Sequence, residues 1–149
     1  MIWNKDLRTR LFEALSSIVE VRYLSIDFGQ TDGYLTEEVP RPPFRCPAIL
    51  VSDIREEVES SYMDKDSQPH HFSFSLRLLI DDARFATSSA PQAHLQAYDD
   101  ALQLTESIIA KVSALDERMA LSARTEAQLR DSLRQYTLSF SLLRRFPTL

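Results

Sequence analysis

Two segments of the chain alternate apolar and polar side chains with a period of two. They are His70–Asp81 (HHFSFSLRLLID) and Arg134–Arg145 (RQYTLSFSLLRR). Successive side chains of a β-strand point to opposite faces of the sheet, so each segment presents one apolar and one polar face. The apolar faces carry Phe72, Phe74, Leu76, Leu78 and Ile80 in the first segment and Tyr136, Leu138, Phe140 and Leu142 in the second. The two segments therefore predict long, half-buried strands.

Two other segments repeat apolar residues every three or four positions, which is the spacing of an amphipathic helix lying on a core. Lys5–Glu20 is the first, and Asn4 is a candidate N-cap because its side-chain oxygen can accept a free amide of the first turn. Its predicted buried stripe is Leu7, Leu11, Leu15 and Ile18, widened by Phe12 and Val19. Pro91–Val112 is the second, with a predicted stripe of Leu95, Tyr98, Leu102, Thr105, Ile109 and Val112.

Shorter segments predict the remaining strands of the sheet. They are Val21–Phe28, Arg45–Ile54, Glu56–Met63 and Glu117–Ala123. Arg45–Ile54 contains a continuous apolar run, which is typical of a central strand buried on both faces. Glu56–Met63 is expected to pair with His70–Ile80 in a meander. The order of elements predicts one α+β domain over residues 1–149, with an antiparallel or mixed sheet of four to six strands and two amphipathic helices on one face.

Chain-bending residues are concentrated between residues 29 and 43. Both glycines of the chain, Gly29 and Gly33, lie there, followed by a cluster of prolines. This composition predicts an exposed loop. Loops of this length are uncommon in compact domains and often bind partners, so a binding role and a simple connection are both open interpretations.

The sequence offers no recognisable catalytic, cofactor-binding or metal-binding constellation. Its glycines do not form a phosphate-binding loop, because they lack the lysine and the following helix that such a loop uses. Cys46 is the only cysteine, which excludes a disulfide or a multi-thiolate metal site, and we expect it to be a small buried residue on a strand. His70 and His71 are neighbours on a strand and point to opposite faces, and His94 lies on a helix. We therefore predict a protein that is not an enzyme and needs no cofactor or metal, with a small hydrolase as the least favoured alternative.

The charge and the hydropathy pattern limit the partners. The net charge is −5, whereas binding to nucleic acid through a broad face uses lysine and arginine against the phosphates. No segment approaches the ~20 consecutive apolar residues of a membrane span, and the first residues lack the apolar core of a secretory signal. We expect a protein made in the cytoplasm that contacts neither nucleic acid nor a membrane, and later incorporation into a particle is compatible with this.

Several elements together resemble the small tail-terminator and tail-completion proteins, or minor tail proteins, of long-tailed phages and prophages. The resemblance is one of pattern and element order, and it spans roughly Lys5–Leu143. It is carried by the amphipathic N-terminal helix, the PPFRCPAILVSD strand entry, the FSFSLRLLI strand, the long helix and the terminal QYTLSFSLL strand. It implies a non-enzymatic subunit of the virion tail that assembles as a ring on the tail tube and faces the head connector.

A ring of identical subunits needs two different, complementary patches on each copy. Clusters of charge are the candidates for these patches, because opposite charges can pair between neighbouring copies. The candidates are Glu56, Glu57 and Glu59 on the acidic side and Arg41, Arg45, Arg144 and Arg145 on the basic side. A solvated strand that discourages aggregation is the plainer interpretation of the glutamates. The alternative function is a small accessory or regulatory domain that binds a protein through the 29–43 loop.

Overall fold

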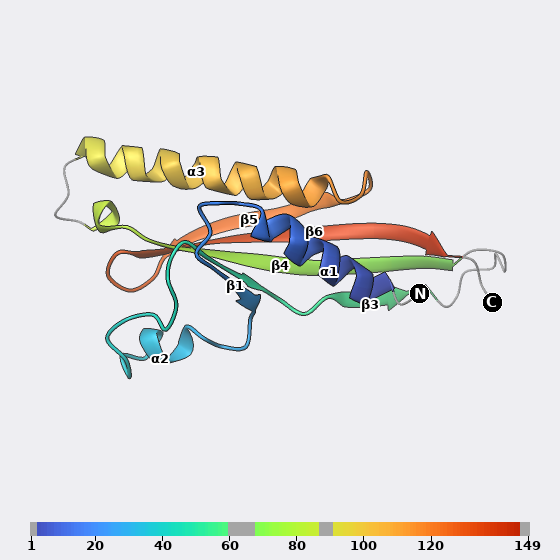
Figure 1. Cartoon of the computed structure of the whole chain (residues 1–149), viewed down its shortest axis with the longest axis horizontal. Helices are drawn as coiled ribbons and strands as arrows, with labels where there is room; N and C mark the ends of the chain where they lie inside the picture. Colours follow the sequence, from blue (N-terminus) through green and yellow to red (C-terminus); the bar gives the residue numbers. More distant parts are fainter. Residues whose placement is uncertain (1–2, 60–67, 87–90, 147–149) are drawn as a thin grey trace.

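The structure, a computed structural model, describes residues 3–59, 68–86 and 91–146. Within this part the chain is α+β, with a six-stranded, mostly antiparallel sheet and three α-helices (Figure 1). In chain order the elements are α1 (Trp3–Ser16), β1 (Tyr23–Ile26), α2 (Asp32–Leu35), β2 (Ala48–Val51), β3 (Arg55–Val58), β4 (Gln68–Asp81), the short 3-10 helix η1 (Ala83–Phe85), α3 (Pro91–Ser113), β5 (Ala120–Gln128) and β6 (Leu133–Phe146).

The two alternating segments form the centre of the sheet. They are β4 and β6, which pair antiparallel over their whole length, from Gln68 opposite Phe146 to Asp81 opposite Leu133. The strand order is β1-β2-β4-β6-β5, and only β1 and β2 run parallel. Strand β3 also pairs with β4, so β2 and β3 follow one another along the same side of it. The prediction of two long, half-buried strands is confirmed.

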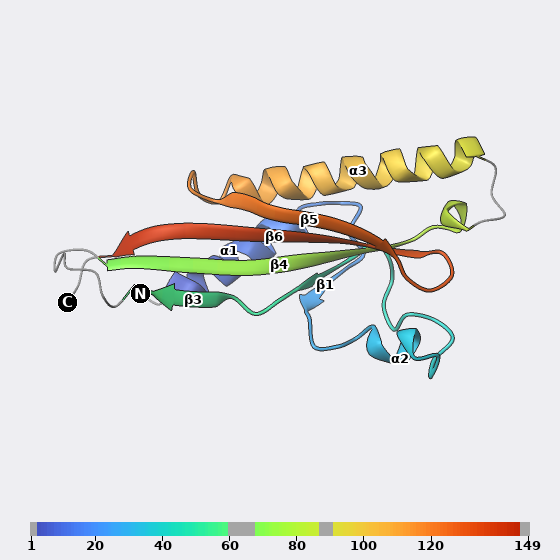
Figure 2. The same cartoon turned by 180° about the vertical axis from the view of Figure 1, so that it is seen from behind.

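Helices α1 and α3 lie on the same face of the sheet, as the two views in Figures 1 and 2 agree. The apolar faces of β4 and β6 meet them in one core cluster. Its helix members include Leu7, Leu11 and Leu15 of α1 and Ala97, Ala101, Ile108 and Val112 of α3. The predicted arrangement of two amphipathic helices on one face is therefore confirmed, with the core between them and the sheet.

The opposite face of the sheet is polar over most of its area and carries Ser73, Ser75, Ser139 and Ser141. One end of this face is covered by α2, which was not expected from the sequence. Tyr34 of α2 packs there in a second, smaller core cluster with Ala48, Leu50, Leu79 and Leu133. The expectation of an exposed loop over residues 29–43 is wrong in this respect, because a helix within the segment buries its tyrosine.

The details of the two long helices correct some of the expectations. Helix α1 ends at Ser16, and Asn4 lies inside it and donates from Nδ2 to the Ile54 carbonyl oxygen at 3.3 Å instead of capping it. Val19 is exposed. The bounds of α3 match the prediction to within one residue, but its buried residues are Ala97, Ala101, Thr105, Ile108 and Val112.

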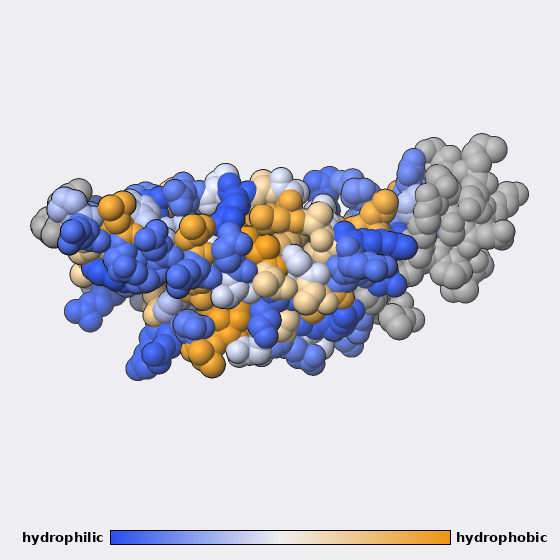
Figure 3. All heavy atoms as spheres, turned by 90° about the horizontal axis from the view of Figure 1, so that it is seen from above, coloured by the Kyte–Doolittle hydropathy of each residue, from blue (hydrophilic) through white to orange (hydrophobic). Residues whose placement is uncertain are grey.

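Leu95 of α3 is 65% exposed, and Tyr98 and Leu102 are exposed as well. The helix therefore turns its alanines to the sheet, because small side chains let the two backbones approach closely in a packed core. Figure 3 looks onto the side of the molecule that carries α3 and shows hydrophobic residues there in separate patches among hydrophilic ones.

The shorter strands differ from the predictions mainly in their ends. All four residues of β2 are buried, which confirms a strand covered on both faces. Strand β5 continues to Gln128, five residues beyond the predicted end. Strand β3 pairs with β4 as predicted, and the rest of the expected Glu56–Met63 strand, from residue 60 on, lies outside the described residues.

Candidate functional site

A cavity of about 590 Å³ lies at the end of the sheet where α2 packs. Its walls come from three parts of the chain that meet there: the segment 40–46, the end of β4 and the connection between β5 and β6. The lining residues include Pro40, Pro42 and Phe44 on the apolar side and Asp81, Asp131 and Ser132 on the polar side. The phenyl ring of Phe44 stacks on Tyr23 of β1 at 5.2 Å between centroids, which holds the apolar wall against the sheet.

Arg130 holds α2 against the β5–β6 connection. Its guanidinium lies over the Tyr34 ring at 4.6 Å, and Nη1 donates to the carbonyl oxygens of Tyr34 at 2.8 Å and Val39 at 3.0 Å. The Tyr34 hydroxyl in turn donates to the Arg130 carbonyl oxygen at 3.2 Å. Burial, assisted by the nearby Asp131 carboxylate, raises the pKa of Tyr34, so the phenol stays protonated near neutral pH. This side of the cavity is fixed by direct contacts.

Arg77 fixes the same segment from the polar face of the sheet. It lies on β4 and donates to Gln135 Oε1 at 2.8 Å, to Asp27 Oδ2 at 3.0 Å and to Thr31 Oγ1 at 3.1 Å. Asp27 and Thr31 flank the turn between β1 and α2, so a single guanidinium attaches this turn to the two central strands. The first half of the 29–43 segment is therefore part of the folded body.

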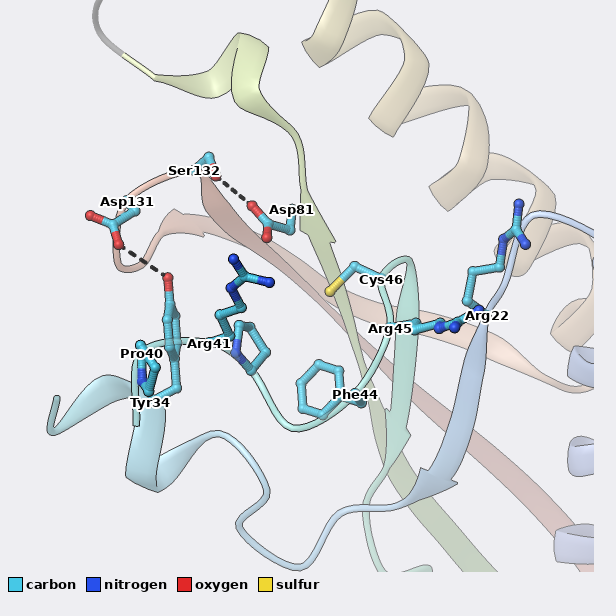
Figure 4. A pocket seen from close by; sticks show the side chains of 11 residues that line it. Arg22, Tyr34, Pro40, Arg41, Phe44, Arg45, Cys46, Asp81, Asp131 and Ser132 are labelled. Atoms are coloured by element: carbon cyan, nitrogen blue, oxygen red, sulfur yellow. Dashed lines mark hydrogen bonds between the residues drawn. The ribbon is translucent and has the colours of Figure 1, made fainter. Parts of the chain in front are cut away.

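Three arginines surround the cavity without a salt-bridge partner. Arg22, Arg41 and Arg45 are exposed, and none of them is in an ion pair among the residues that the structure describes. Figure 4 shows Arg41 extended over the cavity between Tyr34 and Asp81, and Arg22 and Arg45 together beyond Cys46. Most other described arginines do have a carboxylate partner: Arg55, Arg77, Arg84, Arg124, Arg130, Arg134 and Arg144.

The carboxylates of the cavity are occupied by neighbours. Asp81 Oδ1 accepts a short hydrogen bond from the Ser132 hydroxyl, and Asp131 Oδ2 lies 3.6 Å from Arg130 Nε. Because the acids have partners and three guanidinium groups have none, the rim of the cavity is positive in a chain whose net charge is −5. An arrangement of this kind attracts anionic groups such as carboxylates.

Cys46 lies at the edge of the cavity, just before β2, and is half-buried, whereas we expected it on a strand and buried. Burial, with a smaller contribution from the Asp81 charge, raises the pKa of its thiol to about 11. The thiol is therefore neutral near pH 7. A neutral thiol is a poor nucleophile, since the thiolate is the reactive form.

The acidic candidates lie at the other end of the sheet. Glu56 and Glu57 are on β3, whose four residues are all exposed, and Glu59 follows it. Glu56 Oε2 is 2.7 Å from His70 Nδ1, and Glu57 Oε1 is 2.7 Å from Arg55 Nη2. Among the described strands, β3 pairs only with β4, so its outer edge is free. The glutamates therefore form an exposed acidic edge.

Arg144 lies at this same end, on the part of β6 that extends past β5. Its Nη1 donates to Asp116 Oδ2 at 2.7 Å, which ties the turn after α3 to the sheet. The backbone of Arg145 is opposite Pro69, and its side chain lies outside the described residues. The structure thus separates the basic candidates: Arg41 and Arg45 line the cavity, and Arg144 does not.

Arg22 belongs to the basic group but was missed in the sequence. The parallel pairing of β1 with β2 places it there, since Tyr23 is opposite Ala48 and the Arg22 amide donates to the Pro47 carbonyl oxygen at 2.8 Å. Recognising β1 and β2 as parallel neighbours would have been the only signal. Arg77 and Arg130, which hold the wall of the cavity, have no sequence signature either, because their partners are 46 to 96 residues away.

The described residues contain no group of three or more His, Cys, Asp or Glu side chains that could hold a metal ion. None of the helices in that part of the chain has the length and apolar character needed to cross a membrane. Comparison with protein-family models and with curated proteins finds no match for this chain.

Proposed function

We propose that this chain is a non-enzymatic structural subunit of a phage or prophage tail, a tail-terminator or tail-completion protein that forms a ring of identical copies. Support comes from the element order that resembles this class and from a fold with that order. The partners in this role are further copies of the chain and the proteins of the tail tube and head connector. The subunit is made in the cytoplasm and then incorporated into the virion.

The separation of charge along the sheet is the observation that carries the proposal. The cavity with its three unpaired guanidinium groups includes Asp81, at one end of β4, and the acidic strand β3 lies beside His70, near the other end. These two residues are eleven positions apart, which is about 35 Å of extended strand. Two different patches at opposite ends of one subunit fit a head-to-tail contact, which closes into a ring when the rotation between neighbours allows it.

The experiment that tests this is light scattering coupled to gel filtration over a wide concentration range, followed by negative-stain imaging of any large species. The proposal expects a closed ring of defined mass that accumulates as the concentration rises. A chain that stays monomeric at every concentration, or that stops at a two-fold dimer, contradicts a ring built from this protein alone.

A second function, a small accessory or regulatory protein-binding domain, is favoured by the cavity itself. Its volume of about 590 Å³ lies within the ~300–1,000 Å³ range of ligand sites. The wall formed by Tyr34 and Pro40 belongs to the 29–43 segment. The discriminating result is a monomeric protein that binds a short glutamate-rich peptide in a titration calorimeter, and loss of that binding in Arg41→Glu.

A further inference from the structure

We propose that the acidic strand β3 of one copy docks at the basic cavity of the next copy, with Glu57 and Glu59 facing Arg41 and Arg45. The inference rests on the proposed ring and names the contact that joins adjacent subunits in it. The two surfaces cannot meet within one copy, because they lie at opposite ends of β4 (Figure 1).

The basic surface is built before any partner arrives. Arg130 holds the Tyr34 and Val39 carbonyls, and Arg77 holds the turn before α2. Little ordering of the backbone is therefore needed on association, and ordering is one of the main costs of binding. Arg41 and Arg45 lie on either side of the apolar Pro42 and Phe44, so the surface combines two separate cationic groups with an apolar wall between them (Figure 4).

The acidic surface has the matching chemistry. Glu57 and Glu59 are two positions apart in extended backbone, so their side chains share one face of the strand and lie about 7 Å apart. The Glu59 amide still donates to the Pro69 carbonyl oxygen at 3.2 Å, which keeps this residue aligned with β4. Val58, between them, is exposed. Acid, apolar and acid thus follow one another on a free edge.

The present partner of Glu57 does not prevent this exchange. Its ion pair with Arg55 joins side chains that are 62% and 76% exposed, and pairs as exposed as this contribute little. Glu56 is a weaker candidate, because it points to the other face and its carboxylate contacts His70. Arg144 is a weaker candidate on the basic side, because it holds Asp116, whose side chain is only 11% exposed. The geometry therefore selects four of the seven charged candidates.

The occupant is a second copy because the charges of the two ends are complementary. A like-charged contact at either end would repel, so two copies cannot join through two basic or two acidic ends. Each bound pair leaves one basic cavity and one acidic strand free, and further copies add in the same sense.

Charge reversal tests the contact. The double variants Arg41→Glu/Arg45→Glu and Glu57→Lys/Glu59→Lys each place like charges against each other in a homogeneous sample. We expect each of them to weaken self-association more than about a hundredfold, so that rings disappear at concentrations where the wild type forms them. In a 1:1 mixture every contact between unlike variants again joins opposite charges, and association returns.

The control carries the same change in net charge at a distant place. Glu13→Lys/Glu20→Lys alters two exposed glutamates on and just after α1, and it is expected to assemble like the wild type. Circular dichroism confirms that each variant is folded, since all substituted side chains are exposed.

The outcomes separate this inference from the ring itself. Rings of the wild type that persist in both charge-reversal variants overturn the contact and leave the proposed function standing. Variants that fail to assemble alone and also fail as a mixture overturn the pairing of these four side chains. A wild type that never assembles overturns the ring, and the contact with it.

Discussion

Arg134 provides a stringent test of how the helical layer is attached to the sheet. Its side chain lies on the helix side of β6 and is 8% exposed. The guanidinium carbon lies 4.6 Å from the ring centroid of Tyr98, 5.5 Å from that of Tyr136 and 6.0 Å from that of Phe85. These rings belong to α3, β6 and η1, so one cation joins three elements. The perturbation is Arg134→Ala.

The expected loss follows from the contacts that disappear. Arg134 Nε donates to the Tyr136 hydroxyl at 3.1 Å, and leaving this buried hydroxyl without its donor costs about 1–3 kcal/mol. The cation and aromatic ring contacts contribute about 0.5–2 kcal/mol. The ion pair with Glu126 adds only about 0–1 kcal/mol, because that carboxylate is 56% exposed. We therefore expect Arg134→Ala to lower the free energy of unfolding by about 3 kcal/mol, a value dominated by the first two contributions.

A companion variant separates packing from charge. Arg134→Met keeps much of the apolar stem, which also packs against the neighbouring rings, and should recover about 1 kcal/mol of the loss. Combining Arg134→Met with Tyr136→Phe gives a double-mutant cycle, in which the hydrogen bond predicts a coupling of about 1 kcal/mol.

Urea unfolding followed by far-UV circular dichroism measures these values, at protein concentrations below assembly so that association does not add to stability. An unchanged slope with urea shows that the folded and unfolded states are comparable. A loss below about 0.5 kcal/mol in Arg134→Ala, the size of an ordinary surface substitution, would refute the assigned role of this cluster.

Three further perturbations test other parts of the fold. Leu138→Asp places a charge in the core between sheet and helices and should prevent folding, whereas Leu95→Asp on exposed α3 should change the free energy of unfolding by less than about 0.5 kcal/mol; equal effects in urea melts would contradict the observed orientation of α3. Arg130→Met removes two hydrogen bonds to the backbone and should raise proteinase K cleavage within residues 29–43 about tenfold while the sheet stays folded, and an unchanged cleavage rate would show that other contacts hold the segment. The thiol of Cys46 should react slowly with iodoacetamide at pH 8 and faster as the pH approaches 11; because folding raises its pKa from 9.0 to about 11, the free energy of unfolding should fall as pH rises through this window, and Cys46→Ala should lack that part of the decline.

The sequence by itself determined the central sheet, because a period of two is a local property of an extended chain. The alternation in His70–Asp81 and Arg134–Arg145 predicted two half-buried strands, and β4 and β6 have those faces. The continuous apolar run in Ala48–Val51 likewise predicted burial on both sides. The bounds of α3 followed from its apolar spacing and from Pro91 at the first turn.

The rotation of α3 could not be read in the same way. Apolar residues occupy more than one stripe of this helix, so the periodicity allows either Leu95 and Leu102 or Ala97 and Ala101 to face inward. Only the space left above β6 and β5 selects the alanines, and that space depends on side chains from distant parts of the chain. The packing of Tyr34 beneath Arg130 was hidden for the same reason, since the two residues are 96 positions apart.

Only the tertiary structure placed the charges. Arg45 and Glu57 are twelve positions apart in the sequence, and as a cluster of opposite charge they suggest nothing about separate ends. Strands β2 and β3 run in one direction along β4, so the chain leaves the cavity at Cys46 and reaches the opposite end at Val58. An extended chain advances about 3.3 Å per residue, and a dozen residues therefore carry the acidic edge about 40 Å from the arginines.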